Sequence, residues 1–208
     1  MTEYTANLVY AYDPGALNES FSDIFGTAIE FYAQGPATSS WDMGTANFVL
    51  RDMANPKSEN QPDTYKGQNW ESGSFDNGGV HINSGVQNYW YYLLYEGGTG
   101  TNDNGDVYAV SQIGMDSAGA VAYINLAYYL TVNSQYSDAR IGSILSAVDL
   151  YGTCAYQVEQ VIKAWHAVGL GPDNFTDDFY TLESSTLQSG CDLSSSETLS
   201  MMISYNPP

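Results

Sequence analysis

The sequence predicts a mainly helical fold of about five helices, with a long irregular region inside it. Apolar residues recur at steps of three or four in five stretches, which is the spacing of one buried helix face. Short connections after residue 80 favour helices that pack against their neighbours in the sequence. Hydrophobic residues make up 43% of the 208 positions, which is enough to form a sizeable core.

The first predicted helix spans residues 15–33. At about 100° per residue, three carboxylates, Glu19, Asp23 and Glu30, fall within roughly 40° of one another. The apolar stripe on the opposite side consists of Leu17, Phe21, Ile24, Ala28 and Tyr32. The acidic face is either a solvated surface or part of a site, and for an arbitrary helix the solvated surface would be preferred.

The middle of the chain is expected to be irregular. Residues 34–79 carry Gly, Pro, Ser, Asn and Asp throughout and keep no period, and loops of that length usually bind something or build a site. Helical spacing returns at residues 80–95 and stops at Gly97 and Gly98. The acidic stretch at 99–106 lacks the spacing and the closing Glu of an EF-hand, so a tight turn is favoured over a calcium loop.

Two further helices are expected between residues 119 and 152. The first covers 119–130 and includes Tyr123 among its buried residues. The second has Ser137 as its N-cap, with Tyr136 and Ile141 placed to form a hydrophobic staple. Its inner face is expected to include Ile141, and Gly152 closes it.

The last helix is expected to begin at Thr153 and to end at Gly169, where a left-handed glycine is favoured. The helical domain therefore covers residues 1–171. Residues 172–208 are rich in Ser and Thr and end in a stretch of alternating period. We interpret them as a linker and the start of a truncated β-type module, and the alternative is an extension docked on the helical domain.

The composition excludes several classes of partner. Five Lys and Arg against 24 Asp and Glu give a formal net charge of −19, which repels phosphate backbones and anionic lipid head groups. No apolar run approaches the ~20 residues of a membrane span, and residues 1–5 do not read as a secretory signal. We expect neither nucleic acid nor membrane as a partner. Cys154 and Cys191 are either one disulfide or two buried thiols.

Two motifs carry most of the functional information. Residues 18–26 read Asn-Glu-Ser-Phe-Ser-Asp-Ile-Phe-Gly, and residues 76–85 read Asp-Asn-Gly-Gly-Val-His-Ile-Asn-Ser-Gly. The first resembles the segment of thermolysin-like zinc endopeptidases (gluzincins) that carries the third metal ligand. The second resembles the loop of that family that enters a helix with an active-site histidine. With matches elsewhere, the resemblance covers roughly residues 2–170 in order.

The resemblance implies a role for each matching residue. Glu19 matches the zinc ligand, and Asp23, one turn later, matches the carboxylate that orients a metal-bound imidazole. His81 matches the donor that stabilises the transition state, and Asp76 matches the carboxylate that fixes the tautomer of that histidine. Tyr10 matches the active-site tyrosine whose hydroxyl helps to hold the oxyanion.

A third match concerns substrate binding. Residues 50–53, Leu-Arg-Asp-Met, are similar to the Leu-Arg-x-Met of the family. The resemblance implies that Arg51 binds the substrate carbonyl. It also implies that Leu50, joined by Met43, lines the apolar pocket for the residue after the cleaved bond.

The sequence departs from the family at its metal sites. It contains no His-Glu-x-x-His motif, and its only histidines are His81 and His166, so it cannot supply two imidazoles and a carboxylate to one zinc ion. The paired calcium site of the family is eroded. Two positions match calcium ligands, Glu30 and Asp42, and two others lack the expected carboxylate, Ser40 and Thr45.

The resemblance implies the C-terminal helical half of a secreted zinc metalloendopeptidase. Calcium is a possible further ion, but two calcium ions are not expected at the eroded site. The expected partners of this chain are a peptide or protein substrate and an N-terminal half, either encoded in the same gene or made as a separate chain. We expect these 208 residues to be inactive alone. The alternative is a non-catalytic peptide-binding module derived from such a peptidase.

Overall fold

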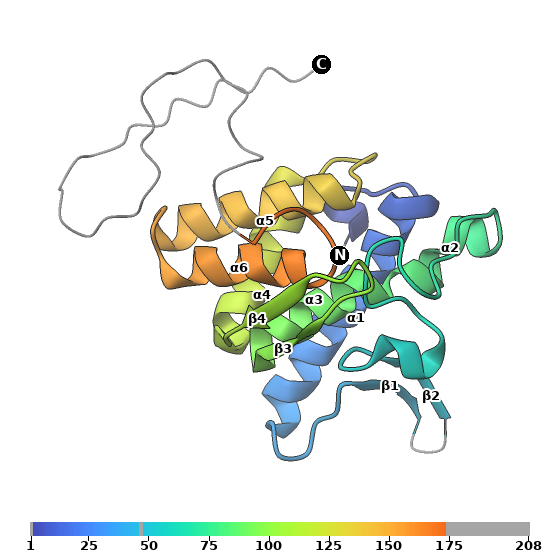
Figure 1. The fold of residues 1–208 in the computed structure, drawn as a ribbon, viewed down its shortest axis with the longest axis horizontal. Coiled ribbons are helices and arrows are strands. Elements are labelled where there is room, and N and C mark those ends of the chain that lie inside the picture. The colour runs from blue at the N-terminus through green and yellow to red at the C-terminus, as the bar shows by residue number, and fades with distance from the viewer. Residues whose placement is uncertain (1, 46–47, 174–208) are drawn as a thin grey trace.

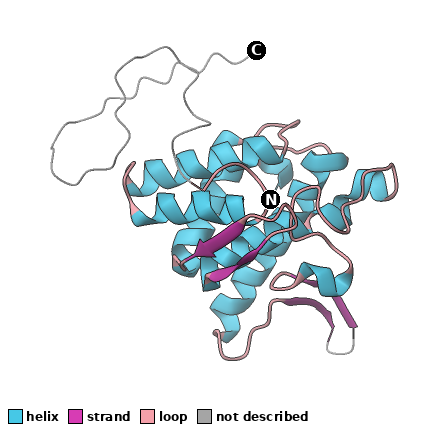
Figure 2. Cartoon of the chain, viewed as in Figure 1, coloured by secondary structure: helices cyan, strands magenta, loops and turns pink. Residues whose placement is uncertain are grey.

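The structure is a computed structural model that describes residues 2–45 and 48–173. Helices dominate it, which confirms the predicted fold class (Figure 1 and Figure 2). A 3₁₀ turn, η1 (Thr2–Tyr4), leads into the long helix α1 (Tyr12–Gln34), which packs against helices α2 to α5. The helices that follow α1 are α2 (Asp76–Asn83), α3 (Gly85–Glu96), α4 (Gly114–Ile124), α5 (Tyr136–Tyr151) and α6 (Tyr156–Ala167).

Large side chains from α1, α3, α5 and α6 form the core. The rings of Trp90 and Trp165 stack with their centroids 4.9 Å apart and join α3 to α6. The Trp165 indole N–H donates to the Ser143 hydroxyl at 2.6 Å, so this buried polar group is paired. From α1, the fully buried side chains include Leu17 and Phe21. The core therefore holds one end of α1 firmly in place.

The C-terminal end of α1 differs from the prediction. Tyr32, expected in the apolar stripe, is 91% exposed. Its neighbour Phe31 is buried instead, with its ring 4.9 Å from that of Trp41. The position of Trp41 determines which of the two side chains is buried, and the helical period of α1 does not predict that position.

Two β-hairpins lie in regions where no strand was predicted. In the stretch expected to be irregular, β1 (Asp42–Thr45) pairs antiparallel with β2 (Phe48–Asp52), and a 3₁₀ turn, η2 (Pro56–Glu59), follows. β3 (Gly98–Thr101) and β4 (Val107–Val110) flank a tight turn in the acidic stretch, as Figure 1 shows in front of α3. Strands of four or five residues are too short to show a period in the sequence.

The helix expected at residues 80–95 is two helices. Asp76 to Gly79, at the start of α2, form a left-handed turn, so the right-handed helix begins at Val80, where it was predicted. Ser84 separates α2 from α3. Gly85, the first residue of α3, packs closely against the loop at Pro62. A Cβ on Gly85 would lie 2.6 Å from the Pro62 carbonyl oxygen. Gly97, at φ 77°, ends α3 where the sequence predicted a stop.

The helix expected at 119–130 starts earlier and changes its winding. α4 begins at Gly114 and continues into a π-helical turn, η3 (Asn125–Tyr129). Tyr123, expected to be buried, is exposed. The buried residues keep the spacing of a single helix face, and Tyr123 lies outside that face; they are Ala118, Val121, Ala122, Asn125 and Leu126.

The ends of α5 and α6 also differ from the prediction. The N-cap of α5 is Gln135 rather than Ser137, and Gln135 forms a capping box with Asp138. The predicted staple is wrong, because Tyr136 lies in the core while Ile141 is exposed. α6 begins at Tyr156, three residues after Thr153, and is followed by Gly169 in a left-handed conformation at φ 82°.

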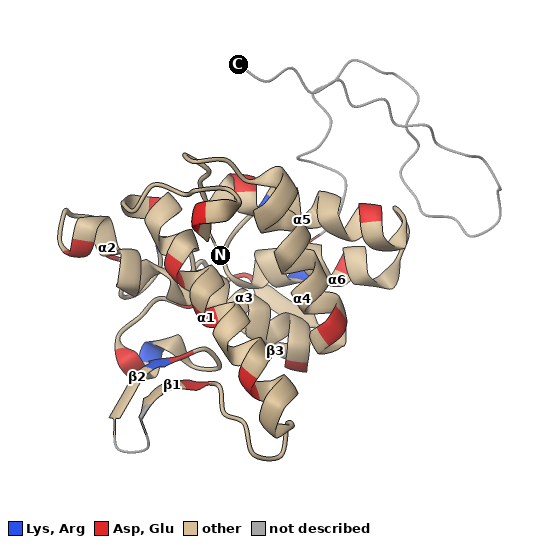
Figure 3. Ribbon diagram, turned by 180° about the vertical axis from the view of Figure 1, so that it is seen from behind, with Lys and Arg blue, Asp and Glu red and all other residues tan. Residues whose placement is uncertain are grey.

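The predicted β-type module at 172–208 lies outside the described residues from 174 onward. So does Cys191, so one disulfide with Cys154 and two buried thiols both remain as alternatives. In the described ranges, no helix is both long enough and apolar enough to cross a bilayer. Figure 3 shows Asp and Glu on most helices and few Lys or Arg, as the net charge of −19 requires.

Candidate active site

Three side chains from separate segments meet beside the first turns of α1. The Tyr10 hydroxyl donates to Glu19 Oε1 at 2.6 Å. The same hydroxyl lies 3.0 Å from His81 Nε2, which is 3.5 Å from Glu19 Oε2. Tyr10 precedes α1, Glu19 lies on α1 and His81 lies on α2, so the packing of α2 against α1 creates the cluster.

A left-handed turn positions His81. The four residues from Asp76 to Gly79 have positive φ angles of 51°, 53°, 88° and 81°. This turn folds the Asp76 carboxylate back, so that Oδ1 lies 2.7 Å from His81 Nδ1 and Oδ2 accepts the His81 backbone N–H at 2.7 Å. Asp, Asn and Gly are the residues that tolerate this conformation. The local sequence therefore fixes an imidazole ring that is itself 47% exposed.

The Tyr10 hydroxyl donates its one proton to Glu19. Its oxygen and the Asp76 carboxylate each lie within hydrogen-bond distance of one ring nitrogen of His81. An ionised carboxylate only accepts hydrogen bonds, so the contact with Asp76 favours a tautomer of His81 that carries its proton on Nδ1.

The Tyr10 hydroxyl is held in its protonated form. Partial burial and, next, the hydrogen bond to Glu19 raise the pKa of Tyr10 to about 12. At neutral pH the phenol is therefore neutral and can donate. The phenol of Tyr10 and the imidazole of His81 thus both lie beside the Glu19 carboxylate.

Asp23 lies one turn further along α1 and is only 2% exposed. Its carboxylate meets Arg51 in two contacts of 2.7 Å, through Nη2 and Nε, and accepts the Asn88 side-chain N–H at 2.8 Å. Burial raises the pKa of Asp23, although Arg51 and Asn88 oppose the shift. Arg51 is thus paired with Asp23 through one hydrogen bond, from Nη2, and one ion-pair contact, from Nε, and its guanidinium has further N–H groups for another acceptor.

The two apolar residues predicted to bind substrate lie on the first hairpin. Leu50 on β2 is half-exposed and is adjacent to Arg51. Met43 on β1 pairs with Arg51 across the hairpin and packs partly against the core. The hairpin therefore carries all three of the predicted substrate-binding residues.

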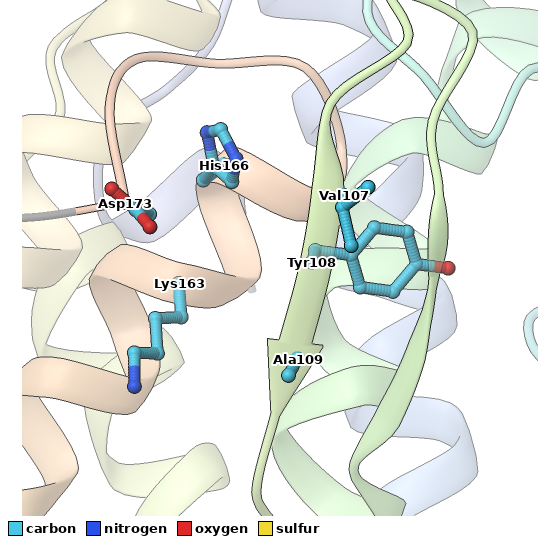
Figure 4. Close-up of a pocket in the computed structure, with 6 residues that line it drawn as sticks. All are labelled: Val107, Tyr108, Ala109, Lys163, His166 and Asp173. Atoms are coloured by element: carbon cyan, nitrogen blue, oxygen red, sulfur yellow. The ribbon is translucent and has the colours of Figure 1, made fainter.

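The described residues do not form a zinc site by themselves. Glu19 is one carboxylate, and no three His, Cys, Asp or Glu side chains in the described ranges are placed to hold a metal ion. The second histidine, His166, lies on α6 with Nδ1 3.0 Å from the Gly171 carbonyl. Figure 4 shows it beside a separate hollow of ≈ 240 Å³ that Lys163 and Asp173 also line.

The residues matched to a calcium site lie near the first hairpin. Glu30 is partly buried on α1, and the Asp42 N–H donates to the Ser40 hydroxyl at 3.0 Å. Asp42 lies opposite Asp52 in the hairpin, so two like charges face each other. The side chain of Thr45 lies outside the described residues.

The comparison with known families decides the identity of this domain. The family described as "Thermolysin metallopeptidase, alpha-helical domain" matches residues 6–170. This chain belongs to that family. It is the C-terminal helical domain of a thermolysin-like metallopeptidase.

Individual members of the thermolysin family are similar over most of the chain. Thermolysin of Alicyclobacillus acidocaldarius subsp. acidocaldarius is 41% identical over 177 residues, or 82% of this chain and 31% of that protein. Bacillolysin of Bacillus cereus is 40% identical over 177 residues, or 82% of this chain and 30% of that protein. The precursor of protealysin, a metalloproteinase from Serratia proteamaculans, has a TM-score of 0.67 at 25% identity over 82% of this chain and 54% of that one. The chain thus spans about a third of the curated relatives that it matches.

Two supporting residues of this thermolysin-like site were not predicted. Asn88 donates to the buried carboxylate of Asp23, and the Gln61 side chain donates to the His81 carbonyl at 2.6 Å. Both are almost fully buried. Helical spacing gave no signal for either residue, because Asn88 lies nearly opposite the apolar stripe that includes Val86 and Trp90, and Gln61 lies in a stretch without period.

Proposed function

We propose that this chain forms one wall of the catalytic cleft of a zinc-dependent metalloendopeptidase. The observation that carries the proposal is the convergence of Glu19, Tyr10 and His81 from three separate segments. The relatives of the chain are named as proteases, and the family is a metallopeptidase family. The intact protein would be secreted and would act on peptides or proteins.

Glu19 would be one zinc ligand, and two imidazoles would come from residues outside these 208. When bound, zinc supplies a Lewis acid and lowers the pKa of a water molecule. Because the described residues offer one ligand, we expect the chain alone to hold no zinc usefully. Asp23 would orient one of the incoming imidazoles, as a buried carboxylate beside the site.

His81 and Tyr10 would donate hydrogen bonds to the carbonyl oxygen that gains negative charge during hydrolysis. The left-handed turn and Asp76 hold the ring before substrate arrives, and preorganised donors of this kind are each worth about 10²–10³ in rate. The free N–H groups of Arg51 would bind a further substrate carbonyl. Leu50 and Met43 would line the pocket for an apolar side chain after the cleaved bond.

The proposal is tested by complementation. The chain is co-expressed with a separate N-terminal segment carrying a His-Glu-x-x-His helix, and both zinc content and casein cleavage are measured. The chain alone should show no cleavage with added zinc, and the complex should cleave. Glu19→Gln should abolish zinc retention and cleavage, whereas Glu159→Gln, at an exposed position on α6, should leave both unchanged.

Robust cleavage by the chain alone would contradict the proposal, as would full zinc retention by Glu19→Gln. The second candidate function, a non-catalytic peptide-binding module, is favoured by the single zinc ligand among the described residues. It predicts that peptides bind to the chain while complementation never produces zinc-dependent cleavage. We also propose that Glu30 and Asp42 bind calcium, which is tested by comparing thermal unfolding in calcium chloride and in sodium chloride.

A further inference from the structure

A hollow of ≈ 400 Å³ lies between the start of α1 and the loop that precedes α2. Its walls include three aromatic side chains, Tyr12, Tyr65 and Trp70, and Gly78 lies at its edge. The rings of Tyr65 and Trp70 meet edge to face with their centroids 4.9 Å apart. This aromatic wall is therefore braced by its own packing.

Tyr12 connects the hollow to the candidate active site. It follows Tyr10 by two residues, and its ring lies against Gly78 in the left-handed turn that positions His81, where a Cβ would collide with it. Its φ of 51° is an outlier for an aromatic residue. Tyr12 thus has a strained backbone, and the residue is 57% exposed, so a ligand can reach it.

Polar residues also line the hollow, and both of its carboxylates accept hydrogen bonds from within the chain; these polar residues are Asp13, Lys66, Glu71, Ser72, Asn83 and Gln135. The Tyr65 hydroxyl donates to Asp13 at 3.0 Å, and the Gly73 N–H donates to Glu71 at 2.5 Å. The Lys66 ammonium lies 4.9 Å from the centroid of the Tyr65 ring, so it would repel a second cation. The three aromatic rings are the largest side chains of the walls, and they offer an apolar or aromatic group a surface to pack against.

α1 fixes the order of the sites along the cleft. Tyr12 and Glu19 are seven residues apart on this helix, which is about 10 Å along its axis. Asp23, further along in the same direction, holds Arg51 and the adjacent Leu50. The Glu19 cluster thus lies between the hollow and Leu50.

We infer that the hollow is a specificity subsite for an apolar or aromatic side chain of the peptide substrate, about three residues before the cleaved bond. In this proposal the peptide runs parallel to α1, and because an extended peptide advances about 3.3 Å per residue, about 10 Å along the helix corresponds to about three residues. The inference rests on the proposed function, in which Leu50 lines the pocket for the residue after the bond. Tyr12 and Trp70 are its specificity-determining residues.

Binding to the chain tests the subsite without any requirement for catalysis. The probe is acetyl-(4-fluorophenylalanyl)-Gly-Gly-Leu-amide, followed by ¹⁹F NMR during titration with the 208-residue chain. Tyr12→Asn removes the ring and places a residue that tolerates positive φ, so the fold should be retained. The control is Tyr128→Asn, at a 74% exposed tyrosine on η3. We expect affinity to fall at least fivefold in Tyr12→Asn and to stay unchanged in the control.

Equal affinity of Tyr12→Asn and the wild-type chain would overturn the inference. In the complemented enzyme, replacing the 4-fluorophenylalanine of the probe with glycine should lower kcat/KM about tenfold. In Tyr12→Asn, the two peptides should have nearly equal kcat/KM. Zinc-dependent cleavage without this preference would overturn the subsite but not the proposed function. Absence of any zinc-dependent cleavage, with the ¹⁹F result intact, would overturn the proposed function and leave the hollow as a peptide site.

Discussion

At the residue scale, Asp23 connects the fold to the candidate site. It is buried on α1 with three charge-assisted contacts, two from Arg51 and one from Asn88. Such a pair adds little compared with apolar residues of the same volume, but losing one partner leaves an uncompensated buried charge. Arg51 is therefore a structural partner of α1 as well as a candidate ligand for substrate.

Arg51→Met should destabilise the chain by about 3 kcal/mol, because the buried Asp23 would lose its counter-ion and would have either to stay charged or to take up a proton at neutral pH. The measurement is urea unfolding at neutral pH. The control is Lys163→Met on α6, whose partner Glu159 is exposed, and here we expect at most about 0.5 kcal/mol. Equal losses in both variants would mean that the Arg51 pair contributes no more than a surface pair.

At the element scale, the turn from Asp76 to Gly79 determines where α2 starts and where His81 points. Four consecutive positive φ angles are possible here because two residues are Gly and two are Asp and Asn. The turn also packs closely, since a Cβ on Gly79 would lie 2.7 Å from Glu71 Cβ. Backbone conformation and packing therefore both select glycine at this position.

Two glycines separate these effects. Gly79 and Gly105 have similar φ angles, 81° and 90°, but a Cβ on Gly105 would have no atom within 4 Å. Gly105→Ala should cost about 1 kcal/mol through backbone strain alone. Gly79→Ala should cost at least about 2 kcal/mol because overpacking adds to the strain, and thermal unfolding measures both. A cost at Gly79 no larger than that at Gly105 would contradict the packing argument.

The β3–β4 hairpin is attached to the rest of the fold through Asp103. Its carboxylate accepts a hydrogen bond from Lys57 at 2.7 Å and from the Gln68 N–H at 2.7 Å. Burial alone would raise the pKa of Asp103, but these two donors outweigh it and lower the pKa. A carboxyl with a lowered pKa in the folded state stabilises the protein above about pH 4, and this contribution is lost as pH falls further.

Asp103→Asn should therefore lower the free energy of unfolding by about 1 kcal/mol at neutral pH. The difference from the wild-type chain should shrink below about pH 4, and urea titrations at both pH values measure it. Asp106→Asn serves as the control, because Asp106 lies in the same turn and accepts from Asn102 rather than from a lysine. A difference that is independent of pH would show that the charge of Asp103 does not act in this way.

At the scale of the whole molecule, the helices and the motif residues were predictable, but the contacts between segments were not. Glu19 and His81 are 62 positions apart, and only the family resemblance linked them before the structure placed them 3.5 Å apart. Tyr32 and Ile141 fit a helical period and are exposed, because neighbouring elements rather than the period decide burial. The hairpins were missed because all four strands are short and one strand of each, β1 and β3, contains Gly and Thr, so that pairing across the turn, not sequence period, defines them.

The net charge of −19 also belongs to this scale, and it predicts how salt acts on stability. Repulsion among 24 carboxylate side chains opposes folding, and five Lys and Arg offset little of it. Raising sodium chloride from about 10 mM to about 100 mM shortens the screening length from about 30 Å to about 10 Å. We therefore expect the midpoint of thermal unfolding to rise by several degrees.

Screening also weakens the surface ion pairs, such as the one between Lys163 and Glu159, so a lower midpoint in salt would mean that ion pairs outweigh repulsion. Calcium chloride at the same ionic strength separates general screening from binding at a site. If screening alone acts, the two salts should shift the midpoint equally. An additional rise with calcium that Glu30→Gln abolishes would instead show a bound ion at Glu30, because that substitution removes one ligand and barely changes the net charge.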